Sequence, residues 1–183
     1  GRMDTVHQAE GWTTAPGVFS AGHVDPASRL LVEHLPADLT GRIADFGAGW
    51  GYLSGAIARR FPGTCHIDLY EADYLALQAA KQNMAERLQE TEAGFFWIDL
   101  ASETVERRYD AIVMNPPFHE GRAADPALGQ AFIEAAAKAL RSGGRLFLVA
   151  NRGLPYEAVL AGRFGQSGEL ARDAHYKVLW GSR

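Results

Sequence analysis

A rigid loop that can accept hydrogen bonds is predicted near the middle of the chain, at Asn115-Pro116-Pro117-Phe118. Two consecutive prolines fix φ, remove two N–H donors and hold the preceding residue in an extended conformation. The Asn115 side-chain oxygen and the Pro116 carbonyl can then each accept one N–H of an exocyclic amine. Phe118 offers a face on which a flat base can stack, a contact worth about 1–3 kcal/mol. We therefore predict Asn115, Pro116, Pro117 and Phe118 as catalytic residues that direct the nitrogen of a planar amine at an electrophile.

A second candidate site is a glycine-rich turn, Asp45-Phe46-Gly47-Ala48-Gly49-Trp50-Gly51. Gly47 and Gly49 would let the backbone approach a ligand closely, and the helix start behind them offers unpaired N–H groups. A dinucleotide fingerprint needs G-x-G-x-x-G, but its last glycine position holds Tyr52 here. Asp45 would repel a pyrophosphate and attract a cationic amino-acid group. The turn therefore predicts a ligand that carries an amino-acid moiety, and it argues against NAD.

Two further acids stand at the ends of predicted strands. Glu71 closes the second strand, where a carboxylate can accept from both hydroxyls of a ribose. Asp99 closes the third, where its carboxylate could accept from an adenine amine. Both acids have structural alternatives as helix-capping or surface residues, Asp99 through the run Asp99-Leu100-Ala101-Ser102. A rigid loop around a packed Phe118 is the corresponding alternative for the proline run.

The elements that must position these residues alternate between strand and helix. Apolar runs predict strands at 42–46, 109–115 and 145–151, an alternating run predicts one at 64–71, and an aromatic and β-branched run predicts one at 94–100. Continuous apolar runs are typical of strands buried on both faces of a parallel sheet. Helical periodicity predicts helices at 27–35, 52–61, 73–92, 127–140 and 155–164, with Gly143-Gly144 as a stop before the fifth strand. The tail at 174–180 reads as a final strand or hairpin.

This alternation predicts an α/β fold with a doubly wound, mostly parallel sheet. In such sheets ligands bind beyond the carboxyl ends of the strands, and the first and fourth strands lie side by side. The glycine turn and the proline run should therefore face one common crevice. Transfer of a group between ligands bound at the two loops would be impossible if the loops opened on opposite sides of the molecule.

Length and composition indicate one globular domain. The chain has 183 residues, of which 47% are hydrophobic and 22% charged. These values exclude disordered and collagen-like classes, and we expect an N-terminal tail at 1–15 and one domain at 16–183. A single cysteine, Cys65, no apolar run of about 18 residues and no signal peptide favour a cytoplasmic protein without a membrane span. The six histidines show no metal-ligand spacing, so we predict no metal.

Charge is unevenly distributed along the chain. The net charge of −4 argues against a protein that binds nucleic acid over its whole surface. Residues 121–183 carry nine Lys or Arg against five acids, a balance of +4, so residues 1–120 carry −8. The basic segment is interpreted either as solvated helix and strand faces or as a basic rim near an active site.

Taken together, these motifs resemble the class I S-adenosylmethionine-dependent methyltransferases that modify planar amino groups. More narrowly, four runs look like the catalytic half of the bacterial small-subunit ribosomal RNA guanine-N2 methyltransferases, of the methyltransferase small domain type. The runs are Gly17-Val18-Phe19-Ser20 with Asp25 and Ser28-Arg29-Leu30-Leu31, then Asn115 to Gly121, Ala150-Asn151-Arg152, and Leu154-Pro155-Tyr156. The resemblance covers the chain from about residue 16 to its end.

The resemblance implies a Rossmann-like, seven-stranded sheet that is mostly parallel with an antiparallel last strand. It implies S-adenosylmethionine over the glycine turn, with Phe19 lining its pocket, Asp45, Gly47 and Gly49 at the methionine part, Glu71 at the ribose, and Asp99 and Leu100 at the adenine. Asn115 would border both donor and acceptor, and Phe118 would hold the target base. The implied activity is methyl transfer to an exocyclic amine, with guanine-N2 of ribosomal RNA as acceptor and ribosomal RNA or the small ribosomal subunit as partner.

The chain departs from the family pattern in two respects. Trp50 occupies a turn position where the family usually has a small residue. The family's proteins also carry an inactive duplicated N-terminal half that helps to engage RNA, and the 183 residues match only the catalytic half. Adenine-N6 of a nucleic acid and a protein glutamine amide are alternative acceptors, because N-P-P followed by an aromatic residue serves all of them. A non-catalytic scaffold of the same fold is the alternative that Trp50 favours.

Overall fold

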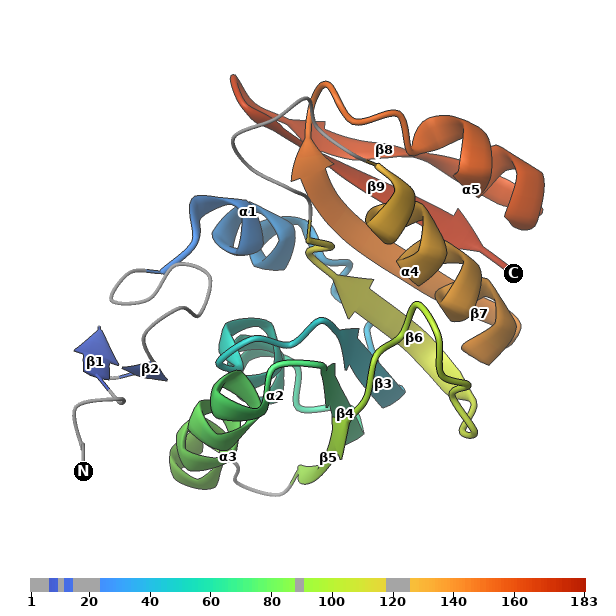
Figure 1. Cartoon of the computed structure of the whole chain (residues 1–183). Helices are drawn as coiled ribbons and strands as arrows, with labels where there is room; N and C mark the ends of the chain where they lie inside the picture. The colour runs from blue at the N-terminus through green and yellow to red at the C-terminus, as the bar shows by residue number, and fades with distance from the viewer. Residues whose placement is uncertain (1–6, 10–11, 15–23, 88–90, 118–125) are drawn as a thin grey trace.

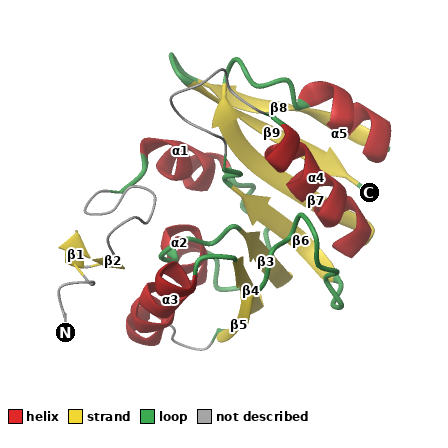
Figure 2. Ribbon diagram, in the orientation of Figure 1, coloured by secondary structure: helices red, strands yellow, loops and turns green. Residues whose placement is uncertain are grey.

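The structure is a computed structural model of the whole chain, and it describes residues 7–9, 12–14, 24–87, 91–117 and 126–183. Its centre is a seven-stranded sheet in the order β5-β4-β3-β6-β7-β9-β8 (Figures 1 and 2). The strands are β3 (Gly41–Phe46), β4 (Thr64–Glu71), β5 (Glu92–Trp97), β6 (Tyr109–Met114), β7 (Leu140–Asn151), β8 (Gln166–Arg172) and β9 (Tyr176–Ser182). The pairs among β3 to β7 are parallel, whereas β9 runs antiparallel to both β7 and β8. The predicted mostly parallel sheet with an antiparallel last strand is confirmed.

Helices cover both faces of this sheet, as Figure 2 shows. One face packs against α1 (Pro26–His34), α2 (Tyr52–Arg60) and α3 (Tyr74–Arg87), and the other against α4 (Ala127–Ala139) and α5 (Glu157–Arg163). On β6, Ala111 and Val113 face the first layer while Ile112 and Met114 face the second, and all four are buried. Each large buried aliphatic side chain contributes about 1.5–3 kcal/mol to folding, so burial on both faces stabilises β6 as the central strand.

Two helices begin at the carboxyl edge of the sheet because a carboxylate caps each of them. The Asp25 side chain accepts from the backbone N–H groups of Ala27 (3.2 Å) and Ser28 (3.4 Å), and Pro26 fills the first position of α1. Asp73 Oδ1 accepts from the N–H of Ala76 (3.2 Å) at the start of α3. Such caps satisfy N–H groups that the first helical turn leaves unpaired.

The sequence pattern was wrong about several boundaries. β7 begins at Leu140 and continues through Gly143, where φ is 82° and the N–H donates to the carbonyl of Arg183 (2.7 Å), so the glycine pair is a strand irregularity and no stop. β5 begins and ends earlier than the range 94–100, because a turn capped by Asp99 follows it. β8 is mostly exposed and polar, so only its pairing with β9 makes it a strand.

A small antiparallel pair, β1 (His7–Ala9) and β2 (Trp12–Thr14), lies within the segment expected to be a tail. It forms a sheet separate from the main one. Over the residues that the structure describes, no helix has the length and apolar character needed to cross a membrane.

Candidate active site

A pocket of about 460 Å³ opens at the carboxyl edge of the sheet. Gly49, from the turn after β3, and Asn115, from the end of β6, both line it, as do α4 residues on the far side. The predicted common crevice is therefore confirmed. Eight of the predicted site residues border this pocket: Gly47, Gly49, Glu71, Asp99, Leu100, Asn115, Pro116 and Pro117. Phe19 and Phe118, also predicted, lie outside the described residues.

The glycine turn adopts backbone conformations that only glycine accepts readily. Gly47, Gly49 and Gly51 have φ values of 79°, 56° and 94°, in the left-handed region where a Cβ is strained. The N–H groups of Gly47 and Ala48 donate to the Tyr70 carbonyl (2.9 and 3.0 Å), which ties the turn to β4. A Cβ at Gly49 would meet no atom within 4 Å. The turn therefore presents bare backbone to the pocket.

Glu71 connects this turn to the start of α3. Its Oε1 accepts from the N–H of Gly49 and its Oε2 from the N–H of Asp73, both at 2.8 Å. Burial raises the pKa of Glu71, the two backbone hydrogen bonds oppose this, and the charge of Asp73 adds to it. Each oxygen has a further lone pair for a ligand, and the side chain lines the pocket. The geometry leaves the predicted ribose contact available.

Asp45 lies beneath the turn and does not reach the pocket wall. It is completely buried, its Oδ2 accepts from Ser54 Oγ (2.7 Å), and its Oδ1 has no partner among the described residues. Burial raises its pKa to about 7, the Ser54 hydrogen bond opposes this, and the charge of Glu71 adds to it. The partner Ser54 was not singled out in the sequence, although it stands on the first turn of α2 directly behind the glycines. Any effect of Asp45 on a ligand would act through its charge from below the turn.

Asp99 has the structural role that the sequence offered as an alternative, and it also borders the pocket. Its Oδ1 accepts from the N–H of Ala101 (3.0 Å) and its Oδ2 from Ser102 Oγ (3.1 Å), which caps the turn after β5. Leu100, the next residue, is buried and lines the pocket beside it. The two roles are compatible, because each carboxylate oxygen can accept more than one hydrogen bond.

The orientation of Asn115 comes from Ser28 of α1 and from Asp25, the cap of that helix, and the sequence did not predict this role for either residue. Asn115 Nδ2 donates to Asp25 Oδ2 (2.5 Å) and to Ser28 Oγ (3.1 Å). Because both partners hold the amide nitrogen, the amide oxygen points away from them. Asp25 and Ser28 are buried, and Ser28 Oγ also donates to Asp25 Oδ2 (3.1 Å), so the arrangement is fixed. The D-P-x-S spacing of these residues is typical of a helix cap. Their contact with Asn115 spans about half the chain, so no local sequence pattern indicates it.

The apolar part of the pocket wall was also missed. Leu128 and Phe132 of α4 line the pocket, and Phe132 belongs to the main core. A Cβ at Gly47 would stand 3.0 Å from the Phe132 ring, so α4 packs directly on the glycine turn. Helical periodicity places these side chains on one stripe of the predicted helix 127–140. It does not indicate that the first turns of this helix face a ligand.

Trp50 does not obstruct the pocket. It is 4% exposed and packs against Val24 and against Ala76 and Ala79 of α3, with its ring edge-to-face to Tyr52 at 5.9 Å. Its carbonyl accepts from Asn83 Nδ2 (2.7 Å). Small residues on α3 make room for the indole, so it forms part of the pocket wall while the space between Gly49 and Asn115 stays open. The feature that favoured a non-catalytic scaffold thus has a packing explanation.

The charged side chains that line the pocket, among the described residues, are all acids: Asp25, Glu71, Asp73 and Asp99. Such a lining favours a ligand with positive charge and opposes a pyrophosphate. Over the same residues, no group of three or more His, Cys, Asp or Glu side chains could hold a metal ion.

A doubly wound sheet with one antiparallel last strand, a glycine turn after its first parallel strand and a pocket at that turn defines the class I methyltransferase fold. The chain belongs to the family described as Methyltransferase small domain, whose sequence profile matches residues 11–180.

Curated relatives carry the name ribosomal RNA small subunit methyltransferase C. The protein of Shewanella sp. (strain MR-4) is 36% identical over 162 residues, 88% of this chain and 46% of the relative. That of Escherichia coli O9:H4 (strain HS) is 38% identical over 165 residues, 90% of this chain and 47% of the relative. The chain thus spans about half the length of these proteins.

A solved structure shares the fold closely. A T. thermophilus 16S rRNA N2 methyltransferase, in complex with AdoMet and guanosine, superposes with a TM-score of 0.81 at 37% identity, over 97% of this chain and 49% of that one. The resemblance drawn from the sequence motifs is confirmed at the level of family and fold.

Proposed function

We propose that this chain transfers a methyl group from S-adenosylmethionine to the exocyclic amine of guanine in small-subunit ribosomal RNA. The observation that carries the proposal is the amide of Asn115, which Asp25 and Ser28 hold by its nitrogen at a pocket shared with Gly49. The relatives named as ribosomal RNA methyltransferases support the choice of acceptor.

The residues present fit this donor. The pocket volume of about 460 Å³ lies within the range of small-molecule sites. Its acidic lining suits a sulfonium and an ammonium group, with Glu71 near the ribose and Asp99 and Leu100 near the adenine. The donor, when bound, supplies an electrophilic methyl group on sulfur. We call the half of the site built from β3, β4 and β5 the donor side.

The opposite half is the acceptor side, built from Asp25 at the start of α1 and from Asn115, Pro116 and Pro117 after β6. There the Asn115 oxygen and the Pro116 carbonyl would each accept one N–H of the target amine, which directs the nitrogen lone pair away from the base ring. The Asp25 carboxylate strengthens the hydrogen bond between the Asn115 oxygen and the target amine. Its charge-assisted hydrogen bond with Nδ2 polarises the amide and makes the amide oxygen a better acceptor. Leu128 and Phe132 limit the access of water to the pocket. Stacking of the base on Phe118 remains a prediction.

The test offers donor with a labelled methyl group to isolated small ribosomal subunits, their naked RNA, DNA and a release-factor protein. We expect label in ribosomal RNA, recovered after digestion as N2-methylguanosine. Label recovered as N6-methyladenosine, or in a glutamine of the protein, would mean that the acceptor is different while the methyl-transfer reaction is the same. Calorimetry with S-adenosylhomocysteine separates the scaffold alternative, because donor-site binding with a negative heat-capacity change is expected of an enzyme. Absence of both binding and transfer would contradict the proposal.

A further inference from the structure

The basic C-terminal region does not present most of its charge to a partner. Of its nine Lys and Arg residues, Arg122 lies outside the described residues and Arg183 donates to backbone carbonyls at the end of α4. Five others form ion pairs, which are Arg141–Asp110, Arg145–Asp38, Arg163–Glu134, Arg172–Glu169 and Lys177–Glu157. Within the described part of the chain, Arg152 and Lys138 are the two others that form no ion pair. Lys138 is in the last turn of α4, away from the carboxyl edge, so Arg152 is the candidate near the site.

Arg152 follows the last residue of β7 and is exposed. Its N–H donates to the His175 carbonyl (3.0 Å), and its Nη1 donates to the Asp173 carbonyl (3.4 Å) in the turn between β8 and β9. A guanidinium has five N–H donors, and this contact uses one of them on a neutral acceptor. The side chain is oriented but keeps most of its hydrogen-bonding capacity.

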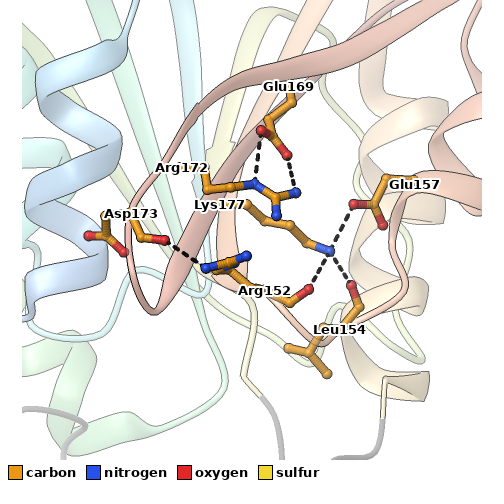
Figure 3. Close-up of polar contacts among 7 residues, drawn as sticks. All are labelled: Arg152, Leu154, Glu157, Glu169, Arg172, Asp173 and Lys177. Carbon is orange, nitrogen blue, oxygen red and sulfur yellow. Dashed lines mark hydrogen bonds and ion pairs between the residues drawn. The ribbon is translucent and has the colours of Figure 1, made fainter.

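The acids near Arg152 are engaged by other donors. Asp173 Oδ1 accepts from the N–H groups of His175 and Tyr176, each at 2.8 Å. Glu169 accepts from both Nε and Nη2 of Arg172 at 3.1 and 2.8 Å. Figure 3 shows Arg152 beside Asp173, to whose carbonyl it donates, and near the Arg172–Glu169 pair. The charge of Arg152 helps to lower the pKa of both acids, behind the hydrogen bonds that dominate each shift.

The backbone around Arg152 is held by a buried lysine. Lys177 on β9 is 3% exposed, and its Nζ donates to the carbonyls of Arg152 (3.0 Å) and Leu154 (2.6 Å) and to Glu157 Oε2 (2.8 Å), as Figure 3 shows. All three ammonium donors are therefore used within the segment that joins β7 to α5. A buried ammonium with a complete set of partners fixes that segment, so Arg152 starts from a rigid backbone.

This segment follows a strand end that packs near α1, the helix whose start holds Asn115. Asn151 pairs with Tyr176 across β7 and β9, and α1 packs against both of these strands. Burial raises the pKa of Tyr176, and the next largest cause is the charge of Asp25, the residue that holds Asn115. Arg152 is thus next to the strand ends that surround Asn115, on the side opposite Glu71 and Asp99.

We propose that Arg152, on the segment fixed by Lys177, binds a backbone phosphate of the RNA strand that carries the target base. This rests on the proposed function in taking RNA as the acceptor. A planar guanidinium matches a phosphate in two parallel hydrogen bonds, and phosphate contacts set the register of a strand without reading its sequence. Lys177 is the positioning residue of this subsite.

The test compares Arg152→Gln with Arg172→Gln. The control residue lies on the neighbouring β8–β9 hairpin, and its substitution removes an equal charge from a cation that is already paired with Glu169. Filter binding measures the Kd of each variant for naked small-subunit ribosomal RNA over a series of KCl concentrations. We expect Arg152→Gln to raise Kd about tenfold and to lower the slope of log Kd against log salt by about 0.7–1. Arg172→Gln should stay close to the wild type, and binding of S-adenosylhomocysteine should be unchanged in both.

Equal Kd and equal slope for the wild type and Arg152→Gln would overturn the inference, as would wild-type RNA binding without salt dependence. If RNA is nevertheless methylated in either case, the proposed function stands without the phosphate subsite. Conversely, Arg152-dependent RNA binding with no methyl transfer would keep the subsite and reject the proposed function.

Discussion

The donor side and the acceptor side of the pocket use charge differently. On the donor side, Glu71 and Asp99 are held by neighbouring backbone or hydroxyl donors and still line the pocket. On the acceptor side, Asp25 acts on a neutral amide, and in the basic C-terminal region outside the pocket most of the described Lys and Arg residues are paired with acids. The comparison teaches that regional net charge is a poor guide to a binding surface, because tertiary pairing decides which charges remain available.

The largest loss of methyl-transfer rate is expected from a substitution on the acceptor side. Asn115→Ala should lower the rate constant of methyl transfer about 100-fold or more, because it removes an acceptor that orients the nucleophile. The Kd of S-adenosylhomocysteine should change by less than about twofold, since the donor contacts lie across the pocket. Single-turnover transfer and calorimetry measure the two quantities. If the transfer rate and the affinity for S-adenosylhomocysteine fall equally, Asn115 is a structural residue and the two sides of the pocket do not act separately.

Asp45, which lies beneath the donor side, should make the free energy of unfolding depend on pH. Its native pKa of about 7 exceeds the ordinary value of 3.8, so between these values the native state binds more protons than the unfolded state. The free energy of unfolding should therefore fall as pH rises through this window, by about 2–3 kcal/mol from pH 5 to pH 8. Glu71, whose pKa is also raised, acts in the same direction.

Urea denaturation without donor, at pH 5 to 8, measures this dependence. Asp45→Asn should flatten the curve, because the amide resembles the protonated acid and cannot ionise. A wild-type stability that rises over the same range would show that Asp45 ionises without cost in the native state.

A substitution on the donor side itself should have a smaller effect, mainly on the affinity for S-adenosylhomocysteine. Glu71→Gln replaces one carboxylate oxygen, each of which accepts a backbone N–H, and should raise the Kd of S-adenosylhomocysteine about tenfold. The rate at saturating donor should change less. Calorimetry gives the Kd, and thermal unfolding checks that the turn at Gly49 persists. A fall in rate with an unchanged Kd would assign Glu71 to the acceptor side.

The smallest effect is expected from Ser28→Ala. It removes one of the two acceptors of Asn115 Nδ2 and leaves Asp25, which also caps α1. The rate of transfer should fall about threefold, in line with one neutral hydrogen bond. Steady-state transfer to ribosomal RNA measures it, with S-adenosylhomocysteine binding as the control. A loss as large as that of Asn115→Ala would mean that Asp25 alone cannot orient the amide.

Much of the fold was predictable where local pattern and burial agree. The run at 64–71 alternates and the run at 109–115 is nearly continuous in apolar residues, and they became β4 and β6 nearly residue for residue. β8 was not predictable, since its residues are mostly exposed and its strand state depends on β9. Likewise, Gly143-Gly144 looks like a helix stop, but backbone hydrogen bonds to the chain end draw it into β7.

The sequence alone determined the alternation of strands and helices, the glycine turn and the proline run, because these depend on side-chain periodicity and on the backbone limits of Gly and Pro. Only the tertiary structure decided how Asp25 and Ser28 orient Asn115, how α3 accommodates Trp50, and how Lys177 fixes the segment of Arg152. Each of these joins residues distant in the chain, and a hydrogen bond or a packing contact depends on distance in space, which no local pattern records.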